Sequence, residues 1–142
     1  MTQPFSSGRC LCGKLTYRVT GPTVWSGYCH CGSCRRFTGS VVTNWLGISE
    51  EHLEFDGEPP AYYRDGGVTR GFCPACGSSL TYASERFPGY VQLHLGSLDE
   101  PESIRPLAHV HFAEKVVWFE IDDDLPRYGG SAADADEDWG NR

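Results

Sequence analysis

The chain of 142 residues is long enough for one domain with a modest hydrophobic core. Its apolar runs extend over only a few residues, as in Val116–Phe119, which excludes a transmembrane helix. Residues 122–142 contain seven acidic side chains and two arginines, and they therefore account for −5 of the net charge of −7. The remaining, nearly neutral sequence has no basic face for a phosphate backbone, so we expect no nucleic-acid partner.

This charge distribution suggests two parts. We expect a folded domain over residues 1–121 and an acidic, flexible tail over residues 122–142, where glycine, serine and alanine precede the last acids. Residues 1–7 do not combine a basic region with an apolar run, so we expect no signal peptide. We therefore expect the protein in the reducing environment of the cytoplasm, where disulfides are rare.

Strand patterns dominate the folded part. Residues 14–19 alternate in polarity, with Leu15, Tyr17 and Val19 on one face, as in a half-buried strand. Further strands are predicted at residues 41–46, 52–55, 90–95, 109–112 and 117–121.

One segment, residues 31–39, is helix-like. Ser33–Phe37 is expected to form a turn or two of helix, which Gly39 ends. The 17 glycines and 9 prolines favour many short elements joined by turns. The predicted fold is mainly β: a small, irregular, multi-sheet domain organised around its cysteines.

The seven cysteines stand in three tight groups, which are Cys10 and Cys12, then Cys29, Cys31 and Cys34, then Cys73 and Cys76. An odd number cannot pair fully as disulfides, and clustered cysteines in a reducing compartment are typical of metal sites. The groups divide into one zinc site of four thiols and one of three, so we expect two zinc ions per chain.

The four-thiol site is predicted to be structural, with the ligands Cys10, Cys12, Cys73 and Cys76. A glycine follows each pair, at Gly13 and Gly77, where a zinc knuckle needs a tight turn. Four thiolates close the tetrahedral site, and the ion would tie together segments more than sixty residues apart. Metal binding should therefore be coupled to folding.

The three-thiol site is the candidate catalytic centre, with the ligands Cys29, Cys31 and Cys34. Three protein ligands leave the fourth position of zinc free for water or an incoming thiol. Zinc with three thiolates has a net charge near −1 and therefore suits another soft ligand. A small thiol held there could attack an aldehyde carbon, and the reverse reaction cleaves a carbon–sulfur bond.

Several neighbouring residues have two interpretations. Arg35 and Arg36, directly after Cys34, either serve the site or are surface arginines on a short helix. If they serve the site, the two arginines offset the negative charge of the three-thiol zinc site, or Arg35 contacts a substrate carboxylate. His30 would have to fold back to bind the same ion as its neighbours, so we expect it to orient nearby groups instead.

The alternative function is a non-catalytic, zinc-stabilised binding module. In that case a protein ligand completes the second zinc, and the candidates are His30, His94, His109 and His111. A disulfide-based redox role is weaker, because no thioredoxin-like βαβ pattern surrounds the cysteines. A nucleobase deaminase is excluded, because Phe72 stands where its signature requires proline.

The aromatic residues Trp45, Trp118 and Phe72 are expected in the core. Trp45 or Trp118 would also suit the wall of a pocket beside the open zinc, because small-molecule sites usually have an apolar lining.

The whole pattern resembles the glutathione-dependent formaldehyde-activating (GFA) family, which includes centromere protein V-like domains. The residues that carry the resemblance are Gly8–Gly13, Tyr17, Cys29–Arg35, Gly39, Phe72–Gly77, Gly96–Asp99 and the segment from His109 to Trp118. The resemblance implies coiled β-sheets of the Mss4-like kind, a structural zinc on the four-thiol set and a second zinc on the three-thiol set. It also implies a carbon–sulfur lyase that condenses glutathione with formaldehyde. The acidic tail lies outside it.

Overall fold

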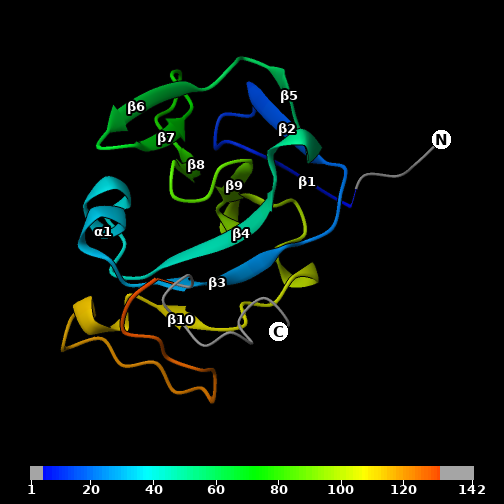
Figure 1. Cartoon of the computed structure of the whole chain (residues 1–142). Helices are drawn as coiled ribbons and strands as arrows, with labels where there is room; N and C mark the ends of the chain where they lie inside the picture. The colour runs from blue at the N-terminus through cyan, green and yellow to red at the C-terminus, as the bar shows by residue number, and fades with distance from the viewer. Residues whose placement is uncertain (1–4, 132–142) are drawn as a thin grey trace.

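The computed structural model describes residues 5–131, which form two β-sheets and one short α-helix (Figure 1). The prediction of a mainly β, multi-sheet domain is confirmed. Within the described residues, no helix is long and apolar enough to cross a membrane.

The smaller sheet has three antiparallel strands in the order β1–β2–β5, with the bounds β1 Ser6–Arg9, β2 Leu15–Val19 and β5 Leu53–Gly57. In β2 the side chains of Leu15, Tyr17 and Val19 are buried, whereas Arg18 is exposed. The alternation predicted for residues 14–19 therefore corresponds to a real strand with one buried face.

The larger sheet has seven strands in the order β10–β3–β4–β9–β8–β7–β6. Their bounds are β3 Trp25–Cys29, β4 Thr43–Ser49, β6 Ala61–Asp65, β7 Val68–Phe72, β8 Ser79–Ser84, β9 Tyr90–Leu93 and β10 His109–Val110. The pair β10–β3 is parallel and the other pairs are antiparallel.

The two faces of the larger sheet have different neighbours. Leu46 and Ile48 of β4, together with Leu93 of β9, point toward the smaller sheet. There they pack against Tyr17 and Val19 to form the largest hydrophobic cluster. Because successive side chains of a strand alternate, Trp45 and Gly47 belong to the opposite face. That face lies away from the smaller sheet.

The helix α1 (Gly32–Thr38) directly follows β3 and begins inside the second cysteine group. The side chain of Cys31 caps its first turn by accepting a hydrogen bond from the backbone N–H of Cys34. Gly39 ends it with a left-handed φ of 78°, as the sequence predicts. Four short 3₁₀ helices complete the assignment: η1 Glu50–His52, η2 Leu95–Ser97, η3 Pro101–Ser103 and η4 Phe112–Glu114.

The strand predicted at residues 117–121 is wrong. Val117 and Trp118 form a turn with exposed side chains, at 88% and 75% exposure, so these residues do not form a strand. The expectation that Trp118 lies in the core or in a pocket wall is wrong for the same reason. The strand predicted at residues 109–112 is shorter than expected, because the chain turns into η4 after β10.

The start of the expected acidic tail packs against β10. Backbone hydrogen bonds join His109 to Pro126 and Tyr128, and His111 to Gly130. Ser131 is buried, so the chain does not fray between residues 122 and 131. Residues 132–142 of the predicted tail lie outside the described residues.

Leu46 tests the core between the two sheets, because its side chain is fully buried there. Leu46→Ala is expected to lower the free energy of unfolding by about 2–5 kcal/mol, through lost apolar burial and the cavity left behind. Leu11, at 81% exposure, supplies the control, and Leu11→Ala should change stability by no more than about 0.5 kcal/mol. Urea denaturation of both variants measures the difference, and equal losses would contradict this core.

Candidate metal centres

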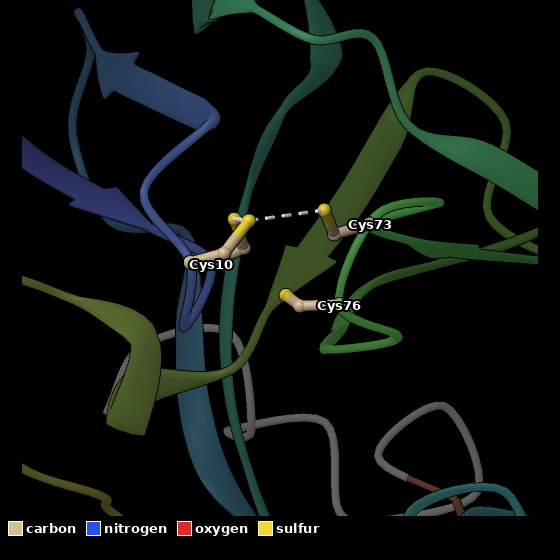
Figure 2. A group of neighbouring side chains, drawn as sticks. Cys10, Cys73 and Cys76 are labelled. Carbon is tan, nitrogen blue, oxygen red and sulfur yellow. Dashed lines mark hydrogen bonds between the residues drawn. The ribbon is translucent and has the colours of Figure 1, made fainter.

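The first centre brings together the four cysteines predicted to hold a structural zinc: Cys10, Cys12, Cys73 and Cys76. Their sulfur atoms all lie within 4.8 Å of one another. Figure 2 shows Cys10 facing Cys73 and Cys76 from a separate loop. The first loop precedes β2 of the smaller sheet, and the second connects β7 and β8 of the larger sheet. The centre therefore joins the two sheets.

Both loops have the same local design. The N–H of Gly13 donates to the carbonyl of Cys10, and the N–H of Gly77 donates to the carbonyl of Cys73. Gly13 and Gly77 have φ values of 79° and 80°, which favour glycine. Ser78 connects the loops, since its hydroxyl accepts from the N–H of Leu11 and lies 3.1 Å from the Cys76 sulfur.

The sulfur separations fit a tetrahedral metal ion. Zinc with four sulfurs at about 2.3 Å places these sulfurs about 3.8 Å apart. The Cys12 sulfur lies 3.5 Å from that of Cys10 and 4.0 Å from that of Cys73. Four thiolates are also a donor set that zinc prefers. This set can therefore hold a zinc ion in a closed site.

The second centre brings together Cys29, Cys31 and Cys34, whose sulfurs also lie within 4.8 Å of one another. Cys29 ends β3, Cys31 caps helix α1 and Cys34 lies in its first turn. The sulfurs of Cys29 and Cys34 are 3.9 Å apart, which again fits a shared metal ion. Among residues 5–131, no histidine, aspartate or glutamate joins this group.

Arg70 of β7 reaches the second centre, although nothing in the sequence analysis indicated it. Its Nη1 donates to the sulfur of Cys34 at 3.6 Å, and the side chain is almost fully buried. The guanidinium lies over the rings of Phe37 and Tyr82. Hydrogen bonds from the other two thiols, followed by this guanidinium, lower the pKa of Cys34. The guanidinium thus favours the anionic form of the Cys34 sulfur.

A cavity of about 780 Å³ opens beside the second centre. All three thiols of that centre line it, together with Arg70 and Trp45, whereas no cysteine of the first centre does. The expectation that Trp45 lies both in the core and in a pocket wall is therefore confirmed. Protein sites for small molecules have volumes of about 300–1,000 Å³. The three thiols consequently face a space that can hold a small molecule.

The histidines considered as additional ligands have other partners. His30 is buried with its Nε2 2.9 Å from Nδ1 of His109, and His109 donates through Nε2 to the Asp123 carboxylate at 2.9 Å. His111 lies 3.3 Å from Glu114. His94 stacks on Trp45 with ring centroids 3.9 Å apart, and burial lowers its pKa to about 4.

Arg35 lies on α1 and donates to the backbone carbonyl of Glu114 at 3.5 Å. It is not among the residues that line the cavity, so its contact with a substrate carboxylate stays a prediction. Arg36 has its Nη1 3.5 Å from the carbonyl of Gly32.

Comparison with known proteins agrees with this geometry. The model of the family described as "Glutathione-dependent formaldehyde-activating enzyme" matches residues 5–114, which include all seven cysteines. The chain belongs to the GFA family. A crystal structure of a Rhodobacter sphaeroides protein has a similar fold, with a TM-score of 0.55 and 17% sequence identity over 85% of this chain and 98% of that chain. No curated protein matches the chain significantly in sequence. The predicted Mss4-like β fold around two cysteine sites is confirmed.

The two centres of this GFA protein should differ in their effect on stability. Cys73→Ser is expected to unfold the chain, because a buried ligand of the centre that joins the sheets is lost. Cys31→Ser is the matched control and should leave the fold largely intact. Circular dichroism and thermal unfolding of both variants measure this difference. A folded, soluble Cys73→Ser variant would contradict a structural role for the first centre.

Proposed function

We propose that this GFA protein is a zinc-dependent carbon–sulfur lyase that acts on the adduct of a small thiol and a small aldehyde, glutathione and formaldehyde or analogues of them. The observation that carries the proposal is the three-thiol centre, whose sulfurs line a cavity. Zinc held by three thiolates would offer its fourth position to the sulfur of the substrate. We also propose that the protein works in the cytoplasm, as its clustered, free cysteines suggest.

The reaction joins the thiol sulfur to the carbonyl carbon, while the carbonyl π-electrons move to oxygen and the proton released by the thiol ends on that oxygen. The reverse reaction breaks the same carbon–sulfur bond. Cys29, Cys31 and Cys34 would fix the position of the substrate sulfur at the end of the cavity. Fixing both reactants in one cavity lowers the entropic part of the barrier.

Arg70 would balance the charge of the substrate complex. A metal ion with three thiolates has a net charge near −1, and a fourth thiolate makes the complex more negative. Arg70 already donates to Cys34 and lines the cavity, so its positive charge lies where that extra charge would develop. Its burial strengthens this effect, because a partly desolvated pair is little screened by water.

The test is a measurement of metal content together with a titration of the cobalt-substituted protein with glutathione. The expected result is two metal ions per chain and a cobalt spectrum that changes as the thiol binds. Cys31→Ser should lose both this response and any turnover of glutathione with formaldehyde. Two metal ions with no response to any small thiol would contradict the proposal and favour a zinc-stabilised binding module.

Arg70→Met should weaken thiol binding by about tenfold or more, because a charged hydrogen bond near a buried anion contributes roughly 1.5–3 kcal/mol. Arg70→Lys keeps the charge and should recover part of the affinity. Arg64→Met is the control, since Arg64 is an exposed arginine on the neighbouring strand β6. The same cobalt titration measures all three variants. Unchanged thiol affinity in Arg70→Met would show that Arg70 does not stabilise the bound thiol.

A further inference from the structure

The floor of the cavity is one continuous face of the larger sheet. Trp25 and Cys29 of β3 point to this face, as do Trp45 and Gly47 of β4. The register extends the face outward, because Gly47 is paired with Gln92 and Gln92 with Tyr82. Tyr82 is in turn paired with Arg70. The reactive centre and the aromatic floor are therefore parts of one surface.

Two glycines leave room for the indole of Trp25 to lie on this floor. A Cβ atom at Gly27 would come within 2.7 Å of the Trp25 ring, and one at Gly47 within 3.2 Å of the Trp25 Cβ. Neither glycine has a positive φ, so space rather than backbone conformation explains them. Phe87 and Tyr90 add two more aromatic side chains to the lining of the cavity. Phe87 lies in the connection between β8 and β9, and Tyr90 begins β9. Five of the residues that line the cavity are thus tryptophan, tyrosine or phenylalanine.

Three charged side chains of the lining contact other groups of the protein, whereas the fourth, Glu85, is exposed. Arg70 contacts Cys34, and Arg86 lies over the Phe87 ring. Glu114 lies 3.3 Å from His111 and accepts from the N–H of Gly32. Beyond the thiols, the lining therefore offers a ligand several aromatic rings together with acidic side chains, which favours an apolar ring over a chain of carboxylates.

We propose that the substrate adduct of this centre carries an apolar, ring-bearing group next to its carbon–sulfur bond, and that Trp25, Phe87 and Tyr90 bind this group. The inference rests on the proposed function and narrows its substrate class to ring-bearing analogues of the adduct of glutathione and formaldehyde. A formaldehyde adduct of a small thiol would leave most of the 780 Å³ cavity unfilled. The ring can come from the thiol or from the aldehyde, and the experiment separates these sources.

The test is isothermal calorimetry with the metal-loaded protein. In the first arm, phenylmethanethiol and 2-mercaptoethanol are titrated separately, since both present a primary thiol but one carries a ring. Burial of a phenyl ring contributes about 1.5–3 kcal/mol, so phenylmethanethiol should bind roughly tenfold or more tightly if the thiol supplies the ring. In the second arm, protein saturated with 2-mercaptoethanol is titrated with phenylacetaldehyde and with acetaldehyde. The same preference for the ring-bearing aldehyde is expected if the aldehyde supplies the ring.

Variants locate the effect in the cavity. Phe87→Ala and Tyr90→Ala, both in the cavity wall, should reduce the ratio of the affinity for the ring-bearing compound to the affinity for its ring-free counterpart. Trp118→Ala is the control, because Trp118 is exposed and does not line the cavity. Its ring preference should equal that of the natural chain.

The outcomes separate this inference from the proposed function. Binding of 2-mercaptoethanol without any preference for a ring-bearing thiol or aldehyde would overturn the inference and leave the open thiol site in place. A preference that survives in both cavity variants would also overturn it. If neither phenylmethanethiol nor 2-mercaptoethanol binds, the proposed function itself is overturned.

Discussion

The contact between two cysteine loops holds the two sheets of this domain together. Cys10 and Cys12 precede the middle strand of the smaller sheet, whereas Cys73 and Cys76 lie between two strands of the larger sheet. The hydrophobic cluster beside them is small, and two of its buried members are themselves cysteines. A domain of this size has limited apolar burial, and metal ligation is a common way to add stability. The glycine turns behind each pair bring the sulfurs to a spacing that suits one ion.

The two faces of the larger sheet carry different sets of side chains. One face supplies the apolar side chains that pack against the smaller sheet, and the other supplies Trp25, Cys29 and Trp45. Because these two sets alternate along the same strands, the packed core lies beneath the three-thiol centre. The helix that follows β3 then adds Cys31 and Cys34 at the edge of the same face. The three-thiol centre therefore lies on a packed sheet and faces the cavity.

Local patterns predicted the parts of the structure that depend on neighbours in sequence. The alternation around Tyr17 and the turn at Gly39 are such cases, as is the spacing of the cysteines. The strand β3 escaped prediction, because both of its faces are largely buried and its sequence, with serine and glycine, shows no alternation of polar and apolar residues. Arg70 was not foreseen, since its role arises from pairing with Tyr82 and from the approach of Phe37 on α1. The cavity likewise combines residues from distant strands, which no local pattern indicates.

We infer that the chain holds one closed and one open metal centre. Anomalous X-ray diffraction from crystals of the zinc-loaded protein soaked with a small thiol tests it most directly. Two zinc peaks are expected, one surrounded by four cysteine sulfurs and one by the sulfurs of Cys29, Cys31 and Cys34 with a thiol from solution facing the cavity. A single zinc peak, or a second zinc completed by a side chain of the protein, would show that the second centre is not an open metal site.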